Sequence, residues 1–539
     1  MARTRFKLLI IAFLLAGCGD EETLKNDTPT IQPGTLIHLG QGQLQGDTDG
    51  GARRFRGIRY AKAPVGPLRW KPAQPVDAWE GVLPATEYGS ACAQSMWLQG
   101  PESLEEDCLF LNVWTPEPAP SAPLPVMVWL PGGGNQNGAA SDDSALSGGA
   151  KVYDGRDLAA SQNVVVVTLN YRVGVMGFFA HPSLPAEGSI SGNQGLGDQQ
   201  LALKWVRDNI VAFGGDRGNV TLFGESAGAQ DTCLQVVSPG AKGLFHRAIS
   251  ESGGCTTFRK PRADAEAQVT AFAEAVGCAG AANELECLRS KPVKDLLVTA
   301  PADGGMPGAP GGSQFSGSIA RWDFNPVVDG QIIPDQPRAL IESGNFAKVP
   351  YLLGSNFEEG RLFMLAAAPV MTEAEYSAAV ERLFKNAAPS VLVRYPLSDF
   401  ATPQDALVRI WGDYRLGCPT NETARRVAAQ GVTTFQYAFA RTIPGLEGLG
   451  PTHGVELPYV FGTLSAPGAD DTALSDGMQG YWARFARTGD PNGEGAVEWP
   501  AFDEAADQRM KFDVPASVAS GYRRVECDFW RTVYDAAFQ

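Results

Sequence analysis

The sequence has a deficit of positive charge and no linker that would divide its main part. Lysine and arginine number 44 against 60 aspartates and glutamates, so the 539 residues carry a net charge of −16. No lysine or arginine run follows the amino terminus, which argues against a nucleic-acid partner and against a basic membrane-binding face. Neither an internal repeat nor a low-complexity linker follows about the first thirty residues. We therefore expect one large domain with an ample core.

The apolar run at the amino terminus is too short for a membrane-spanning helix. The segment MARTRFKLLIIAFLLAGC places three basic residues before the apolar stretch 8–16, as is typical of an export signal. Its end, LAGC, resembles a bacterial lipobox, in which the cysteine is lipidated before cleavage. The alternative is an ordinary signal peptide with an incidental cysteine.

On the lipobox interpretation the chain has three parts. Residues 1–17 are a signal peptide, residues 18–33 are a lipidated Cys18 with a polar, flexible tether, and residues 34–539 are the folded domain. The lipid is then the protein's contact with a bacterial membrane. Gly19 favours the outer membrane if sorting follows the common enterobacterial pattern.

Export makes the cysteines candidates for disulfides. Eight of the nine cysteines remain if Cys18 carries lipid. Spacing alone leaves their connectivity open, since eight cysteines allow about 105 pairings. They are Cys92, Cys108, Cys233, Cys255, Cys278, Cys287, Cys418 and Cys527.

Several short apolar runs are unbroken, not alternating, which is typical of strands buried on both faces of a mostly parallel sheet. A helical apolar spacing over 198–215 separates two of them, so strand, helix and strand predict an α/β crossover fold. The runs are PVMVWL (125–130), NVVVVTLNY (163–171), NVTLF (219–223) and VPYLLG (349–354).

The motif GESAG (224–228) follows the third of these runs. With 62 glycines in the chain, a chance Gly-x-Ser-x-Gly match is common, so the motif alone decides little. Its context is stronger, because NVTLF supplies a strand before Ser226 and AQDTCLQVV supplies the start of a helix after it. This is the strand–turn–helix arrangement of a nucleophile elbow.

A serine nucleophile needs a histidine base held by a carboxylate, and the chain has only four histidines. Three of them are weaker candidates for the base: His38 lies near the tether, His181 lies in a loop, and His246 lies in a packed segment. His453 stands in a glycine-flanked loop after the elbow, in the order serine, acid, histidine. For the acid, GSNFEEG (354–360) leaves Glu358 and Glu359 in competition.

An oxyanion hole requires free backbone amides, and glycines let a backbone approach a ligand closely. Three consecutive glycines occur in LPGGGNQNG (130–138), directly after the first apolar run. The alternative is a flexible glycine turn. The order of the glycine run, the serine, the acid and the histidine along the chain argues against this alternative.

Five further blocks match a family pattern: RFRGIRYAKAPVGPLRW (54–70), EEDCLFLNVWTP (105–116), NYRVGVMGFF (170–179), GNQGLGDQQLALKWVRDNIVAFGGD (192–216) and YWARFARTGDPN (481–492). Through these blocks the chain resembles the type-B carboxylesterases of the cholinesterase family from about residue 35 to the carboxyl terminus. The resemblance implies an α/β-hydrolase fold, a large and mostly parallel sheet flanked by helices in a single domain with insertions. It implies Ser226 as nucleophile, Glu359 as acid and His453 as base, with oxyanion donors at Gly133, Gly134 and Ala227 and no need of a metal or organic cofactor.

The same resemblance suggests disulfides and pocket residues. It implies the pairs Cys92–Cys108, Cys278–Cys287 and Cys418–Cys527, which leaves Cys233 to pair with Cys255. Trp322 matches a family position that limits the size of the acyl group. Asn135 stands where an aromatic or apolar residue is common, which predicts a polar pocket mouth. Trp97 lies near the position of the family's usual cation–π residue. Leu362 replaces the aromatic expected after the acid, so the resemblance favours a broad carboxylesterase for small to medium esters over a choline-specific enzyme.

Two alternatives of other kinds remain. Some relatives in this family have lost the serine or the acid and serve as adhesion modules, and the intact Ser226, Glu359 and His453 argue against that role. A lipase would carry an apolar lid, but the glycine- and proline-rich segment 304–317 is too polar for one. The ester substrate and the oligomeric state remain open.

Overall fold

The computed structural model describes residues 30–95, 102–143, 149–297, 324–364 and 371–538. An eleven-stranded sheet runs through the molecule in the order β14-β13-β12-β11-β10-β9-β7-β8-β6-β4-β3, and a separate three-stranded sheet has the order β1-β2-β5. The strands are β1 (Leu36–Leu39), β2 (Gly42–Gln45), β3 (Asp47–Asp49), β4 (Ala52–Arg59), β5 (Val82–Pro84), β6 (Phe110–Pro116), β7 (Leu124–Leu130), β8 (Val165–Leu169), β9 (Gly215–Glu225), β10 (Arg247–Glu251), β11 (Tyr351–Asn356), β12 (Thr434–Phe439), β13 (Gln508–Phe512) and β14 (Ser517–Ser520).

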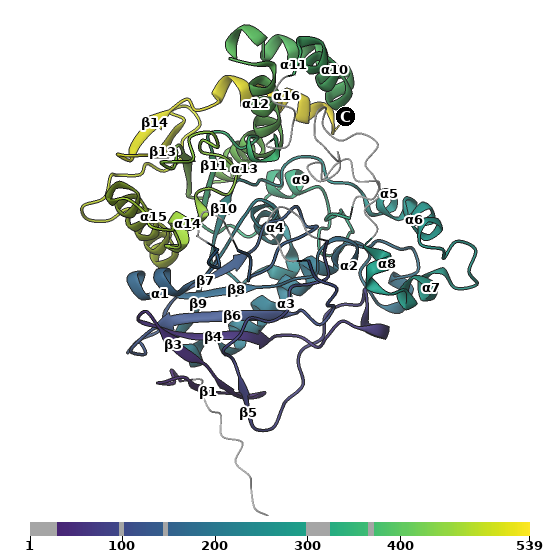
Figure 1. Cartoon of the computed structure of the whole chain (residues 1–539), viewed down its shortest axis with the longest axis vertical. Helices are drawn as coiled ribbons and strands as arrows, with labels where there is room; N and C mark the ends of the chain where they lie inside the picture. Colours follow the sequence, from purple (N-terminus) through teal and green to yellow (C-terminus); the bar gives the residue numbers. More distant parts are fainter. Residues whose placement is uncertain (1–29, 96–101, 144–148, 298–323, 365–370, 539) are drawn as a thin grey trace, which may run out of the picture.

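Helices surround the large sheet (Figure 1). They are α1 (Arg156–Gln162), α2 (Gly174–Gly177), α3 (Gln194–Asn209), α4 (Ala227–Val237), α5 (Arg262–Ala267), α6 (Val269–Ala275), α7 (Glu284–Ser290), α8 (Val293–Leu296), α9 (Pro337–Glu342), α10 (Glu373–Phe384), α11 (Ala388–Arg394), α12 (Pro403–Gly412), α13 (Cys418–Ala429), α14 (Leu457–Phe461), α15 (Ala469–Thr488) and α16 (Arg524–Ala536). Within the ranges described, no helix combines the length and apolarity needed to cross a bilayer.

The centre of the sheet is parallel, and both of its faces are buried. Strands β8, β7, β9, β10, β11, β12 and β13 pair in parallel, whereas the pairs at the two edges are antiparallel. Along β7, Val126 and Val128 pack in one apolar cluster and Met127 and Trp129 in the other, on the opposite face. Because successive side chains of a strand point to opposite faces, this explains why the run is unbroken in the sequence.

All four predicted strands form, with shifted limits. The run 219–223 belongs to a longer β9, whose first residues include the half-buried Asp216 and the exposed Arg217 and therefore lack the apolar pattern of a buried strand. Likewise α3 begins at Gln194, ahead of the predicted start at 198, since buried polar side chains occupy its first turns. The Gln194 amide, for example, donates to the Phe179 carbonyl at 2.9 Å.

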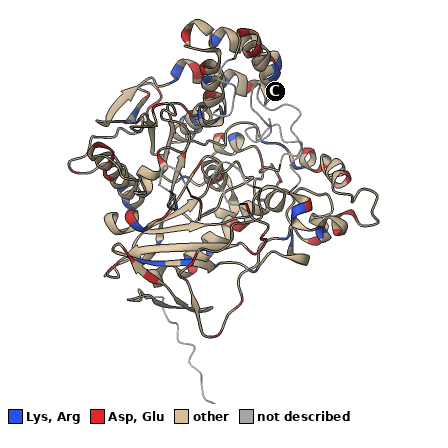
Figure 2. Ribbon diagram, viewed as in Figure 1, with Lys and Arg blue, Asp and Glu red and all other residues tan. Residues whose placement is uncertain are grey.

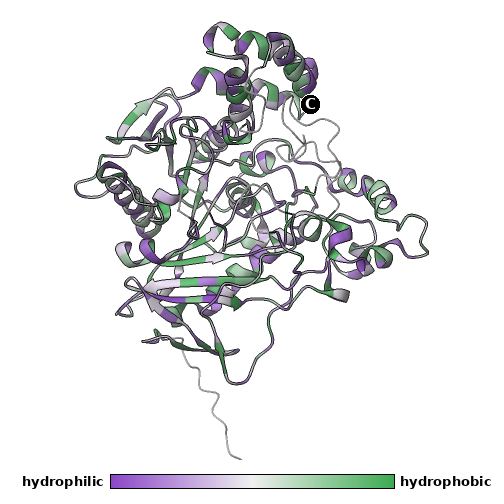
Figure 3. Ribbon diagram, viewed as in Figure 1, coloured by the Kyte–Doolittle hydropathy of each residue, from purple (hydrophilic) through white to green (hydrophobic). Residues whose placement is uncertain are grey.

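A third apolar cluster joins α10, α11 and α12 to α16 at the top of Figure 1. Helix α16 buries Cys527, Trp530 and Tyr534, which lie three and four residues apart and therefore share one helical face. The outer helices in this region show both hydrophobic and hydrophilic stripes (Figure 3). Lysines and arginines are interspersed with aspartates and glutamates along them (Figure 2).

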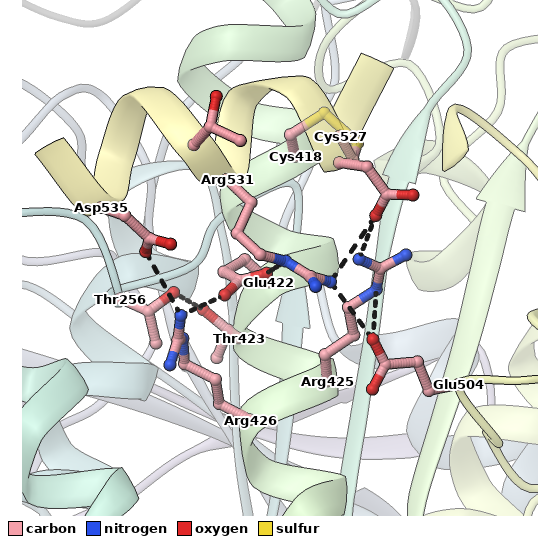
Figure 4. Close-up of polar contacts among 12 residues, drawn as sticks. Thr256, Cys418, Glu422, Thr423, Arg425, Arg426, Glu504, Cys527, Arg531 and Asp535 are labelled. Carbon is pink, nitrogen blue, oxygen red and sulfur yellow. Dashed lines mark hydrogen bonds and ion pairs between the residues drawn. A yellow bond between two sulfur atoms is a disulfide. The ribbon is translucent and has the colours of Figure 1, made fainter. Parts of the chain in front are cut away.

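The four disulfides join the pairs expected from the family resemblance: Cys92–Cys108, Cys233–Cys255, Cys278–Cys287 and Cys418–Cys527. The last pair links α13 to α16, and a network of arginines and carboxylates surrounds it (Figure 4). In this network Arg425 contacts Asp528 at 2.7 Å, Arg426 contacts Glu422 at 2.5 Å, and Arg531 contacts Glu422 at 3.0 Å and Glu504 at 3.3 Å. The carboxyl-terminal helix is thus fastened to the helix that packs on β11 and β12.

Candidate active site

Ser226 stands at a sharp turn between β9 and α4. Its backbone has φ 57° and ψ −120°, a conformation that costs a non-glycine residue about 1–3 kcal/mol. The Ser226 amide donates to the Glu251 carbonyl at 2.8 Å, and the Gln230 amide donates to the Ser226 carbonyl at 3.0 Å. A Cβ atom on Gly224 would come within 2.7 Å of the Leu130 carbonyl oxygen, and one on Gly228 would collide with the same oxygen. The two glycines of the motif therefore let the elbow pack against the end of β7.

The glycine run 132–134 lies directly beside this elbow. Leu130 at the end of β7 pairs with Gly224 of β9, and a Cβ atom on Gly132 would be 3.1 Å from the Ser226 Cβ. Gly133 and Gly134 have φ of 109° and 65°. Among the described residues, no acceptor takes a hydrogen bond from the amide of either glycine. The loop beside the serine thus contains two amides without an acceptor among the described residues, and an oxyanion hole requires amides of this kind.

Asn135 does not supply the polar pocket mouth that its position suggested. Its side chain is 2% exposed, and its amide nitrogen donates to Asp231 Oδ1 at 3.0 Å. The Tyr171 hydroxyl lies 3.2 Å from its amide oxygen. Both the nitrogen and the oxygen of the Asn135 side chain thus have hydrogen-bond partners inside the protein. A buried amide without such partners would destabilise the fold.

Glu359 reaches His453, whereas Glu358 does not. Glu359 Oε2 lies 2.7 Å from His453 Nδ1, and its Oε1 accepts a 2.7 Å hydrogen bond from the Asn356 amide at the end of β11. Glu358 instead pairs with Arg361 at 2.5 Å. Both Glu359 and His453 are buried, at 3% and 7% exposure.

The other ring nitrogen of His453 faces a carboxylate that the sequence analysis did not identify. Glu225 Oε1 is 3.0 Å from His453 Nε2, and in this state Ser226 Oγ forms no hydrogen bond to His453. Burial alone would lower the pKa of His453, but Glu225 and Glu359 together outweigh it and raise that pKa above its ordinary value. Burial also raises the pKa of Glu225, and the neighbouring Glu359 adds to the rise.

Two more buried acids interact electrostatically with Glu225. Glu251, at the end of β10, accepts a 2.9 Å hydrogen bond from Trp482, and burial raises its pKa to about 8. Glu456 accepts a hydrogen bond from Asn356, and burial raises its pKa far above the ordinary value. A carboxylate inside an otherwise apolar segment, as in GVELPYVF, is the signal that would have found Glu456, whereas Glu251 stands between two serines in RAISESG and gives no such signal.

Of the other predicted pocket residues, the structure describes only Leu362. Leu362 is half-buried, and its amide donates to Thr452 at 2.7 Å. The next residue, Phe363, places its ring centroid 5.0 Å from that of His453 and 4.1 Å from that of Trp411. Trp97, Trp322 and Cys18 lie outside the described residues.

The chain is similar to known proteins over nearly its whole length. Residues 33–530 match the family model described as the carboxylesterase family. A cholinesterase of the mouse (Mus musculus) is 34% identical over 586 aligned residues, which cover 99% of this chain and 91% of the mouse protein. The chain therefore belongs to the carboxylesterase family and is a serine carboxylic-ester hydrolase with an α/β-hydrolase fold.

Proposed function

We propose that this enzyme hydrolyses small to medium carboxylic esters with Ser226 as nucleophile, His453 as general base and Glu359 as the acid that orients the histidine. The observation that carries the proposal is the buried 2.7 Å contact between Glu359 and His453 Nδ1. Because Nδ1 is held by the acid, we assign proton transfer at the serine to Nε2, which must exchange its 3.0 Å contact with Glu225 for one with Ser226 Oγ. The free amides of Gly133 and Gly134 beside the strained Ser226 support the same assignment.

We propose acyl transfer through a covalent acyl-enzyme on Ser226. His453 Nε2 takes the proton from Ser226 Oγ, and the oxygen attacks the ester carbonyl carbon to form a tetrahedral intermediate. The amides of Gly133, Gly134 and Ala227 bind the resulting oxyanion. His453 then protonates the departing alkoxide as the carbon–oxygen bond breaks, which leaves an acyl group on Ser226. Water repeats the sequence, releases the acid and restores the serine.

Glu225 is expected to shift the pH dependence of this reaction. Since His453 accepts a proton only when neutral, its raised pKa places the acid limb of kcat/KM above the ordinary histidine value of about 6.5. Glu225→Gln removes the carboxylate beside Nε2, so we expect the limb to move to lower pH. The measurement is the pH profile of kcat/KM, with Glu358→Gln as the matched control. A limb that stays in place or moves upward would refute this role.

Acyl size is the first property to test. The Phe363 ring beside His453 supports a confined site, and Trp322 is proposed as a further limit from its position in the family pattern. We expect turnover of p-nitrophenyl esters to peak at short acyl chains and to fall toward the decanoate. Neutral esters should be turned over at least as well as choline esters, because Leu362 offers no aromatic face to a cation. A maximum at the decanoate would indicate a lipase-like site instead.

The four disulfides and the similarity to a cholinesterase indicate an extracellular or secreted protein. We further propose that residues 1–17 direct export and that Cys18 carries a lipid anchor through the tether up to residue 33. The mass of the amino-terminal peptide from membrane-extracted protein tests this. An unmodified Cys18, or a chain cleaved after it, would exclude the anchor.

A further inference from the structure

Asn135 is held in an unusual backbone conformation directly after the two glycines with free amides. Its φ is 58°, a region that asparagine tolerates better than most side chains. The Gly174 amide donates to its carbonyl at 2.6 Å, and the residue is almost fully buried. The turn that presents the Gly133 and Gly134 amides therefore ends at a residue fixed through both its backbone and its side chain.

The Asn135 side chain links this turn to the helix that begins at the elbow. Its partner Asp231 lies on α4, five residues after Ser226, and is fully buried. Asp231 Oδ1 accepts from Asn135 at 3.0 Å and Oδ2 accepts from Gln199 at 2.7 Å. The charge of Arg259 also acts on Asp231 and favours its ionised form. Burial raises the pKa of Asp231 to about 6, and the bonds from Asn135 and Gln199 oppose this rise.

Tyr171 connects the two ends of the glycine run. Its hydroxyl donates to the Pro131 carbonyl at 2.8 Å and lies 3.2 Å from Asn135 Oδ1. Pro131 directly precedes the glycines and Asn135 directly follows them. The hydroxyl is therefore placed to fix the length and shape of the run between them.

We infer that Tyr171, Asn135 and Asp231 form a positioning network. It holds the Gly133 and Gly134 amides at a fixed distance from the Ala227 amide at the start of α4. The inference rests on the proposed function, since it assigns these three residues to the oxyanion hole of the same site. Two of the proposed donors lie on the loop after β7 and one lies on α4, so three convergent amides require a fixed distance between loop and helix. The Asn135–Asp231 hydrogen bond directly joins these two segments.

The test compares three truncations with one conservative replacement. Asn135→Gly keeps the positive φ accessible and removes only the side chain, Asp231→Ala removes the acceptor, and Tyr171→Phe removes the hydroxyl. Asp231→Asn keeps an oxygen that accepts from Asn135. Activity is measured as the hydrolysis rate of p-nitrophenyl butyrate. The concentration of competent sites is measured separately with diethyl p-nitrophenyl phosphate, which reacts once with each nucleophile and releases one p-nitrophenolate. Each rate is then divided by this concentration.

We expect Asn135→Gly and Asp231→Ala to lower kcat by about 10- to 100-fold, since a displacement near 1 Å at a catalytic group costs up to that factor. KM should change little, and Tyr171→Phe should shift kcat in the same direction. The affinity for 1,1,1-trifluoro-2-hexanone, which forms a tetrahedral adduct with the serine, should fall by the same factor as kcat/KM. Asp231→Asn should restore most of both losses.

Several results would overturn the inference. One is an unchanged kcat per competent site in the truncated variants, which would make the network merely structural. Others are an effect on KM alone, or an Asp231→Asn variant as impaired as Asp231→Ala. If Asn135→Gly does not fold, Tyr171→Phe and the two Asp231 variants decide the question. A wild-type protein that neither hydrolyses the ester nor reacts with the phosphate would instead contradict the proposed function itself.

Discussion

Replacement of Ser226 by alanine is expected to lower kcat/KM for p-nitrophenyl esters by about 10⁴- to 10⁶-fold. The variant lacks the oxygen that forms the acyl-enzyme, so only direct attack by water, assisted by the Gly133 and Gly134 amides, remains. The fold should survive, because alanine has the same Cβ atom as serine and adds no strain at the φ of 57° found there.

The measurement is steady-state turnover together with circular dichroism and mass spectrometry after reaction with an organophosphate. In the wild-type protein the phosphoryl group should be found on the peptide that contains Ser226, and in the variant it should be absent. A folded Ser226→Ala protein that keeps a tenth of the wild-type activity would place the nucleophile elsewhere. A folded wild-type protein without turnover on any ester would favour the adhesion-like role that some family members have.

Replacement of Glu359 by glutamine is expected to lower kcat by about 10³- to 10⁴-fold. Glutamine can still bond to His453 Nδ1, but it no longer stabilises the imidazolium that forms when Ser226 gives up its proton. It can also donate a hydrogen bond, which favours the wrong tautomer of the ring. KM should change much less, since Glu359 is buried behind the histidine and has no position from which to contact the ester.

Glu358→Gln provides the matched control. The two glutamates are adjacent in the chain, but Glu358 pairs with Arg361 at the surface side of the turn, so its loss should change kcat less than about threefold. The double variant Ser226→Ala/Glu359→Gln should be no slower than Ser226→Ala alone, because residues that act as a unit are not additive. Equal losses in Glu358→Gln and Glu359→Gln, or a larger loss in Glu358→Gln, would contradict the assignment of the acid.

The central strands and the serine turn of this enzyme could be predicted from local sequence pattern. Unbroken apolar runs predicted the buried parallel strands, and the run before GESAG predicted the end of β9 at the serine. These features depend on local pattern: side chains that alternate between two buried faces must all be apolar, and a tight strand-to-helix turn needs glycines at 224 and 228. The small number of histidines made the choice of His453 possible without any structure.

The contacts between buried polar groups, in contrast, could be identified only in the folded structure. Glu358 and Glu359 have nearly the same local sequence, and the direction in which the chain leaves β11 brings one of them to His453. Asn135 reads as a pocket residue in the sequence but bonds to Asp231, 96 positions away. The proximity of Glu225 to His453 Nε2 likewise joins residues far apart in the chain. Local pattern carries no record of such contacts, since a buried polar group must find its partner wherever the packing of strands and helices places one.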